Sequence, residues 1–209
     1  MNNTTGDIVL SSVYAGNIDY YSSLICSNSA VIDIHEFFRK QSYRNRCVIA
    51  GANGPLNLIV PIQRVSGKTK MKDIKIDHTQ NWKKIHWKSL ESAYRTSPYF
   101  EYYEHLFYPL YHENKFEFLI DLNDKMAQII LSCFQFEKYI HKSNRYHSKE
   151  NESLDYRQKI HPKQPSLHLS AGIKYMQVFQ DKLGFSPNLS ILDMLFNEGP
   201  NAIVLLKGI

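Results

Sequence analysis

The sequence predicts an α/β fold with a small mixed, mostly parallel sheet, formed by a Rossmann-like start and a β-hairpin, and with a helical second half. Two observations favour this class. Residues 8–34 alternate between apolar strand, turn, helix and apolar strand. From residue 81 onward, apolar residues recur at the spacing of amphipathic helices. With 209 residues, the chain is expected to form a single domain over residues 1–209.

The N-terminal segment is expected to contain a parallel pair of strands. Ile8–Val13 and Ala30–Ile34 are apolar runs of strand length, and Asn17 is suited to cap a helix over Ile18–Cys26. A crossover through one short helix makes the two strands parallel and the connection right-handed. In open α/β sheets, ligands bind at the carboxyl ends of such strands.

Three polar residues lie at these predicted strand ends. Asn17 follows the first strand and is a candidate substrate-binding residue, while His35 and Glu36 follow the second strand. A histidine has a reference pKa of about 6.5, which suits a general base near neutral pH. His35 and Glu36 are therefore candidate catalytic residues, although a surface polar pair without a function is the alternative.

A hairpin and a basic segment follow. Tyr43–Ala50, the turn at Gly51–Gly54 and Leu56–Ile62 predict two antiparallel strands, and Asp73–Asp77 is expected to be another short strand. Residues 39–95 contain 13 Lys and Arg but three acids, a net charge of +10, whereas the whole chain has a formal charge of +5. This asymmetry favours a localised anion site, and a solvated basic face is the alternative.

Four residues of the basic segment are candidate substrate-binding residues: Lys40, Arg44, Asn45 and Arg46. If the chain is extended from Tyr43 onward, Arg44 and Arg46 lie on the same strand face. Two guanidinium groups on one face can clamp a phosphate or a carboxylate. Asn45 is also a candidate donor to an oxyanion. The alternative is an exposed strand face whose acidic neighbours come from elsewhere.

The next helix is predicted over Trp82–Tyr94, with Thr79 or Asn81 as its cap. Trp82 and His86 are four residues apart, so they can stack and hold a sugar or a base. His86 is thus a second candidate general base, and Trp82, Trp87 and Arg95 are candidate substrate-binding residues. Burial in the core is the alternative for the tryptophans.

The remaining elements are mostly helical. Residues 141–166 are polar and are expected to form a flexible loop, and Tyr175–Phe179 is expected to be a short strand or a helical turn. Further helices are expected at Tyr99–Tyr111, Lys115–Phe136, Leu189–Phe196 and Asn201–Leu206.

Several classes of site and location are not indicated. The N-terminus has no signal-peptide pattern, and no apolar run is long enough to span a membrane. Three widely spaced cysteines are typical of reduced thiols in a cytoplasmic protein, and Cys47 is expected to be a buried structural thiol. No metal-ligand spacing, dinucleotide-binding fingerprint or phosphate-binding loop occurs, so no metal and no cofactor is evident.

Several distinctive blocks of residues are spread over nearly the whole chain. The blocks are His35-Glu36, Lys40–Arg46, Gly51–Leu56, Val60-Pro61, Asp77, Trp82, His86-Trp87, Ser92–Tyr94, Ser97–Tyr103, Asp155–Arg157, Ile160–Lys163, Tyr175, Val178–Gln180, Gly184-Phe185, Pro187–Ile191, Asp193 and Leu195–Pro200. In these blocks the chain resembles the WbqC-like protein family. One departure is that the family often has a Pro-Pro turn after the first strand, where this chain has Ala15-Gly16-Asn17.

The resemblance implies a role in bacterial surface-polysaccharide biosynthesis, such as O-antigen or lipopolysaccharide assembly. It also implies transfer of glycine or another amino acid to an amino sugar. The functional hypothesis is an acyl- or aminoacyl-transferase whose partner is a nucleotide-sugar or another phosphorylated small molecule. The alternatives are a non-catalytic nucleotide- or carbohydrate-binding module and a nucleotidyl-transfer or adenylating enzyme. Nucleic acid is the weakest candidate partner because no recognition motif is present.

Overall fold

The computed structural model describes residues 8–65, 67–113, 115–138, 140–146, 154–167 and 172–208. Its parallel sheet has the order β1–β2–β5, formed by β1 (Ile8–Leu10), β2 (Ala30–Ile32) and β5 (Ile140–Lys142). Beyond β1, Asp155 forms an isolated parallel bridge with Val9. The predicted α/β class with a mostly parallel sheet is confirmed.

The first helix joins β1 to β2 as predicted. Helix α1 (Ile18–Cys26) has Asn17 as its N-cap, and the Asn17 side chain accepts a hydrogen bond of 3.2 Å from the backbone N–H of Tyr20. The strands end earlier than predicted, at Leu10 and Ile32, so that the polar residues after them are free to turn toward one another.

The hairpin is confirmed with changed bounds. Strand β3 (Arg46–Gly51) pairs antiparallel with β4 (Gly54–Ile59) through a two-residue turn. The residues just before Arg46 form a turn, so the prediction that the chain is extended from Tyr43 is wrong. The strand predicted over Asp73–Asp77 is reduced to isolated antiparallel bridges at Lys75 and Ile76, because a short 3-10 helix, η1 (Met71–Asp73), occupies its start.

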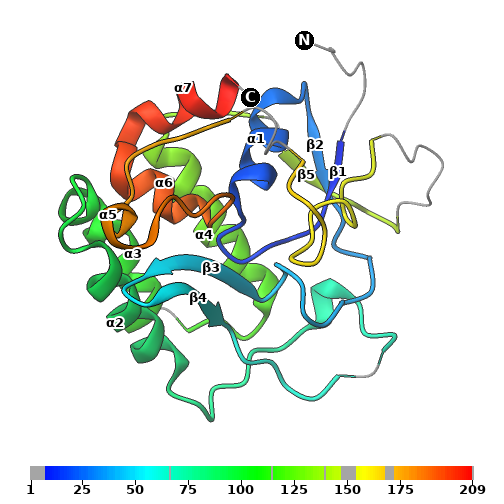
Figure 1. The fold of residues 1–209 in the computed structure, drawn as a ribbon. Coiled ribbons are helices and arrows are strands. Elements are labelled where there is room, and N and C mark those ends of the chain that lie inside the picture. The colour runs from blue at the N-terminus through cyan, green and yellow to red at the C-terminus, as the bar shows by residue number, and fades with distance from the viewer. Residues whose placement is uncertain are drawn as a thin grey trace.

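The second half is helical (Figure 1). The predicted bounds of α2 are confirmed, and α2 packs against both α3 and the hairpin strand β3. The C-terminal helices α6 and α7 pack against α1. The helices are α2 (Trp82–Tyr94), α3 (Phe100–His112), α4 (Leu119–Cys133), α5 (Gln180–Leu183), α6 (Ile191–Glu198) and α7 (Ala202–Lys207), with a 3-10 turn, η3 (Gly199–Asn201), before α7.

The segment predicted as a loop over residues 141–166 is attached to the sheet at two places. Its first two residues belong to β5, and Val9 exchanges backbone hydrogen bonds of 2.9 Å with Leu154 and Tyr156. Residues 147–153 lie outside the described residues. The strand or helical turn expected at Tyr175–Phe179 is replaced by irregular chain that leads into α5.

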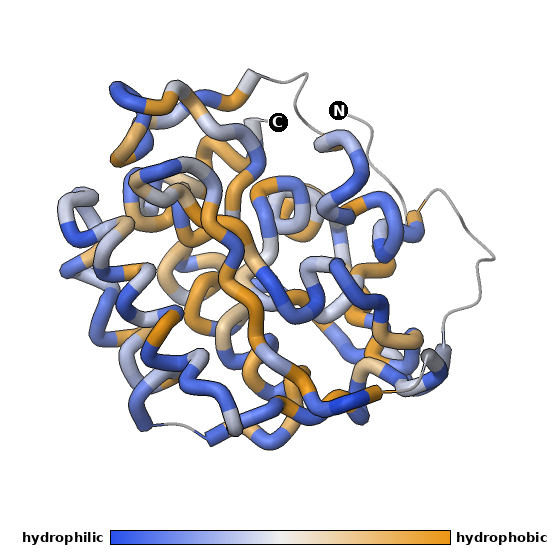
Figure 2. Tube along the Cα trace, turned by 60° about the horizontal axis from the view of Figure 1, so that its bottom comes forward, coloured by the Kyte–Doolittle hydropathy of each residue, from blue (hydrophilic) through white to orange (hydrophobic). Residues whose placement is uncertain are grey.

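The core lies between the sheet, α1, α4 and α6. Figure 2 shows hydrophobic stretches running through the middle of the molecule. One face of α4 is buried in this core, and Leu119, Leu122, Met126 and Ile130 have no exposed surface. Among the described residues, no helix combines the length and apolar character needed to cross a membrane.

The turn between β1 and α1 is held from outside by the start of α6. The Ser190 hydroxyl donates to the Ala15 carbonyl (2.7 Å), and the Ile191 N–H donates to the Gly16 carbonyl (2.8 Å). Ala15 has a φ of +43°, which proline cannot adopt. The Pro-Pro turn that the family often has would therefore need a different backbone in this chain.

Gly16 has no room for a side chain, and we expect Gly16→Ala to destabilise the protein. A Cβ at this position would lie 2.8 Å from Val13 Cγ2 and 3.0 Å from the ring of Tyr20. The predicted loss is about 1–3 kcal/mol in the free energy of unfolding, measured by urea denaturation. Gly67→Ala is the control because nothing lies within 4 Å of its added Cβ. Equal stability of the two variants would contradict the crowding argument.

Candidate functional site at the carboxyl edge of the parallel sheet

A buried ion pair lies where β1 and β2 end. The Arg44 guanidinium binds Glu36 with two hydrogen bonds, Nε to Oε1 at 2.9 Å and Nη2 to Oε2 at 2.5 Å. Arg44 Nη2 also donates to the Ser11 hydroxyl at 2.8 Å. Burial raises the pKa of the Glu36 carboxyl, and the charge of Arg44 opposes that rise. Both side chains are engaged with each other in the interior, with neither presented to solvent.

A second arginine connects the other strand ends. Arg157 is buried and binds both oxygens of Asp155 (2.9 and 2.6 Å), and its Nη1 pairs with the carboxylate of Asp33, which follows β2. The Ser143 hydroxyl, just after β5, donates to Asp33 Oδ1 at 2.8 Å. Asp33 also accepts the backbone N–H of His35 at 2.9 Å. The carboxyl ends of all three strands thus meet in one buried polar network.

Most of this network was not predicted from the sequence. Ligands were expected at the carboxyl ends of β1 and β2, and Asp155–Arg157 is a distinctive block. No role was predicted for Asp33, Ser143 or Arg157. The available signal was an Asp directly after a buried strand together with a later Asp-x-Arg block. The pairing itself spans more than 100 residues, from Asp33 to Arg157, and it has no local sequence pattern.

Above this network, Arg46 lies beside the turn that caps α1. Tyr43 joins the two: its hydroxyl is hydrogen-bonded to Asn17, and the charges of Asp19 and Arg46 act on its pKa, which burial raises to about 12. Arg46 is half-buried, and its Nε is buried without a hydrogen-bond partner among the described residues. Within that part of the chain Arg46 makes no ion pair, so its charge is available to an anion.

His161 shares this region with several cations. Burial lowers its pKa, and the positive charges of Arg44, Lys163, Arg39 and Arg46 lower it further. The Lys163 backbone N–H donates to His161 Nδ1 at 3.1 Å. The neutral ring therefore carries its proton on Nε2, which is a hydrogen-bond donor. His161 was not among the residues predicted for the site.

The other candidate residues predicted between residues 35 and 46 differ in exposure. His35 is half-buried in the turn after β2, and Lys40 is exposed. Asn45 is buried, and one N–H of its carboxamide donates to the Val60 carbonyl at 2.9 Å, so the side chain is engaged inside the protein. Thus Arg46 is close enough for its charge to act on both His161 and Tyr43, and Tyr43 is hydrogen-bonded to Asn17. His35 and Glu36 follow the neighbouring strand β2.

His86 is part of a buried hydrogen-bonded chain. Its Nε2 lies 3.2 Å from the Ile59 carbonyl, which can only accept, so Nε2 carries the proton. Its Nδ1 then accepts from the Tyr14 hydroxyl at 3.0 Å, and the Tyr111 hydroxyl donates to Tyr14 at 2.7 Å. Burial lowers the pKa of His86 to about 4. The interaction connects α2 to the turn after β1 and to β4.

The predicted aromatic residues of α2 pack in the interior. Trp82 contacts His86 edge-on, with ring centroids 5.1 Å apart, so the predicted contact at this spacing exists. Trp87 is buried against the rings of Phe100 and Tyr111. Arg95 is exposed at the end of α2, where it pairs with Glu91 and Glu104.

Two further expectations concern reactive groups. Cys47 is buried, and burial raises the pKa of its thiol to about 12, which confirms the expected structural thiol. Within the described ranges, no group of three or more His, Cys, Asp or Glu side chains is arranged to hold a metal ion.

Removal of one partner from the buried ion pair is expected to destabilise the fold strongly. Glu36→Gln leaves the Arg44 charge buried without an anion, which costs about 3–5 kcal/mol, measured as the free energy of unfolding in urea. The matched control is Glu117→Gln, which removes an exposed pair with Lys75 and should cost less than about 1 kcal/mol. The double variant Glu36→Leu/Arg44→Met should recover part of the loss, and a double variant less stable than Glu36→Gln would refute this account.

The buried His86 predicts a specific pH dependence of stability. The unfolded chain takes up a proton near pH 6.5, but the folded protein does so only near pH 4. The contribution of His86 is therefore complete above about pH 6.5 and falls by about 3 kcal/mol as the pH drops to about 4. Urea unfolding of wild type and His86→Gln across this range should show a steeper loss in wild type. His105→Gln, at an exposed site, should retain the wild-type slope.

Comparisons with known proteins agree with the sequence resemblance. The family model described as WbqC-like protein family matches residues 12–166, which include the strand ends, the hairpin, α2 and the Asp155–Arg157 block. No curated protein matches the chain, and no solved structure does. Because the matched segment spans well over half of the 209 residues, the chain belongs to the WbqC-like protein family.

Proposed function

We propose that this protein is an acyl- or aminoacyl-transferase that acts on the amine of a phosphorylated amino sugar, such as a nucleotide-sugar, in bacterial surface-polysaccharide biosynthesis. The observation that supports it best is Arg46. A half-buried guanidinium without an anionic partner among the described residues lies at the start of β3, where the loop that follows the parallel strand β2 ends. Open α/β folds bind ligands at the loops that follow their parallel strands. The biological setting is part of the proposal and rests on what membership of the WbqC-like family implies.

The phosphate would be bound by the cations around His161. Arg46 offers bidentate hydrogen bonds, and Arg39 and Lys163 add positive charge from two separate chain segments. His161 presents an Nε2–H donor rather than a free acceptor, because its Nδ1 is occupied by the Lys163 N–H. His161 is therefore assigned to hydrogen-bond the phosphate or the oxyanion, and not to remove a proton.

Proton transfer is assigned to His35. Its position after β2 is fixed by the hydrogen bond from its backbone to Asp33, and its ring is half-buried. In the reaction the amine nitrogen forms a bond to the acyl carbon, and the bond from that carbon to the oxygen or sulfur of the donor breaks. His35 takes the proton from the amine and returns it to the leaving group.

Isothermal titration with a uridine diphosphate amino sugar tests the binding role. Arg46→Met should raise Kd at least about tenfold, since it removes the unpaired guanidinium from the site. Arg95→Met is the matched control, because Arg95 is paired with acids at the end of α2, and it should leave Kd unchanged. Equal effects of the two substitutions would contradict the assignment.

The same titration has a pH signature. Bound phosphate favours the charged imidazolium of His161, whose pKa is lowered in the free protein. Binding then takes up a proton between the free and bound pKa values, so Kd should decrease as the pH falls from 7.5 to 5.5. His161→Asn should abolish this slope.

Turnover is measured separately with a glycyl thioester as the probe donor. Product formation unchanged by His35→Ala would refute the base, and binding without turnover would indicate a binding module.

A further inference from the structure

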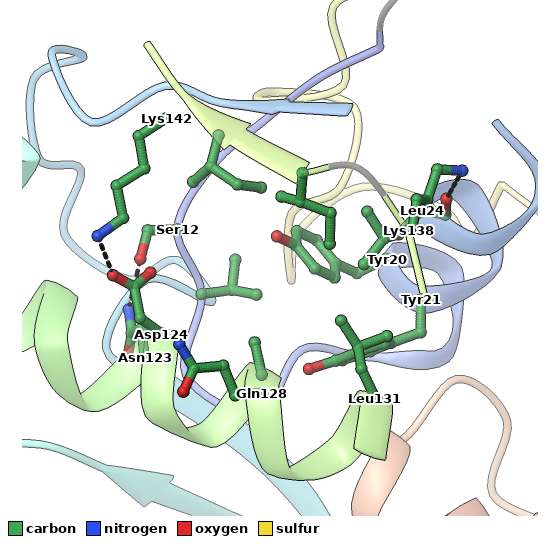
Figure 3. Close-up of a pocket in the computed structure, with 14 residues that line it drawn as sticks. Ser12, Tyr20, Tyr21, Leu24, Asn123, Asp124, Gln128, Leu131, Lys138 and Lys142 are labelled. Atoms are coloured by element: carbon green, nitrogen blue, oxygen red, sulfur yellow. Dashed lines mark hydrogen bonds and ion pairs between the residues drawn. The ribbon is translucent and has the colours of Figure 1, made fainter. Parts of the chain in front are cut away.

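A pocket whose lining does not include Arg46 lies beside the parallel sheet. It is about 310 Å³ in volume and is enclosed by the strand ends, α1 and α4 (Figure 3). Ligand pockets have volumes of about 300–1,000 Å³, and this pocket is at the lower end of that range, so its occupant is small. Its lining includes the apolar side chains of Val13, Leu24, Ile32, Ala127, Leu131 and Ile140.

The polar groups of the pocket are concentrated at one end. Figure 3 shows Asp124, Lys142, Ser12 and Asn123 together on one side, with Gln128 beside them. Asp124 and Lys142 form an ion pair, and about half of the Lys142 side chain is exposed. The opening therefore presents one carboxylate and one ammonium group that are bound only to each other among the described residues.

The far end offers no additional charge to a ligand. Lys138 lines it, but its ammonium group already donates to the carbonyls of Leu24, Ile25 and Ser27 at the end of α1. The tyrosine rings of α1 close this end, and the Tyr20 hydroxyl is used by the Ser11 carbonyl at 3.0 Å. The pocket thus combines an apolar body with one acid–base pair at its mouth.

We infer that this pocket binds a small aliphatic α-amino acid, with its ammonium group on Asp124, its carboxylate on Lys142 and its side chain against the apolar wall. A zwitterion can replace the Asp124–Lys142 pair with two ion pairs and leave no charge unmatched. A simple amine or a simple carboxylate matches just one of the two groups. A sugar would place hydroxyl groups against the apolar wall without hydrogen-bond partners. The inference concerns binding alone and does not depend on the proposed transfer reaction.

Two features support the assignment of the ammonium group to Asp124. Burial raises the pKa of the Asp124 carboxyl, so a cation that neutralises it gains more here than at a solvated carboxylate. Gln128 lies one helical turn beyond Asp124 on α4, within the same lining, and its carboxamide can bind the head group.

Titration calorimetry with L-leucine, isopentylamine, 4-methylpentanoate and glucose tests the inference. Leucine should bind at least about tenfold more tightly than each of the others, because only leucine carries both charges and an aliphatic side chain. Asp124→Asn and Lys142→Met should each weaken leucine binding at least about tenfold, and Ala127→Phe should abolish it by filling the pocket. Asp121→Asn, which removes an exposed acid from the same helix, should leave it unchanged.

Three results would overturn the inference: no binding of leucine at millimolar concentration, tighter binding of glucose, or leucine binding that survives Ala127→Phe. Urea unfolding of each variant verifies that it is folded. Arg46→Met distinguishes this inference from the transferase proposal, since it should weaken binding of the nucleotide-sugar and leave leucine binding intact.

Discussion

The two buried arginines hold together strands that are too short to do so themselves. β1, β2 and β5 each have three residues, so each ladder supplies few backbone hydrogen bonds. The side chains after the strands add the missing connections, through Arg44 to Glu36 and through Arg157 to Asp33 and Asp155. Removing these ions from water is costly. Their contribution is to fix the strand ends in one arrangement, and Asn17, His35 and His161 lie on loops next to these ends.

Another buried carboxylate fixes the C-terminal half against the same edge. Asp193 of α6 accepts hydrogen bonds from the hydroxyls of Tyr94 (2.8 Å) and Tyr175 (2.6 Å), and burial raises its pKa. The Tyr94 hydroxyl also accepts the Ala50 N–H at 3.3 Å, which links α6 to α2 and β3. Because the start of α6 also binds the turn at residues 15–16, the strand that carries Arg46 and the turn that carries Asn17 are held by one helix.

The sequence predicted the locally determined parts of this arrangement. The bounds of α1 follow from its capping residue Asn17, those of α2 follow from its helical period, and both are confirmed. Asn81 occupies the N-cap position of α2 without a side-chain capping hydrogen bond. β5 was missed because its partner β2 lies more than 100 residues earlier, and its three residues look like polar loop. The geometry of Arg44 was also missed. The alternation of side chains along a strand was the basis for the predicted orientation of Arg44, and it takes no account of Glu36. Burying the Glu36 carboxylate without a partner would be costly, so Arg44 turns inward to pair with it. The placement of His86 and Trp82 on one face was foreseen, but that pattern does not distinguish a core face from a ligand face.

The net charge of the basic segment conceals two different kinds of cation. Arg44 is neutralised in the interior, and Lys75 and Arg95 are neutralised by surface acids. Arg46 retains its charge at the strand ends, where Lys163 joins it from outside the basic segment. An anion site therefore depends on which cations the fold leaves uncompensated, and a count along the sequence does not reveal this. The buried pair also makes the site rigid, because Arg44 cannot leave Glu36 for a ligand without exposing a carboxylate to the low-dielectric interior. Under the proposed function, selectivity for a phosphate would then come from Arg46 and His161, the groups that can bind it without breaking the fold.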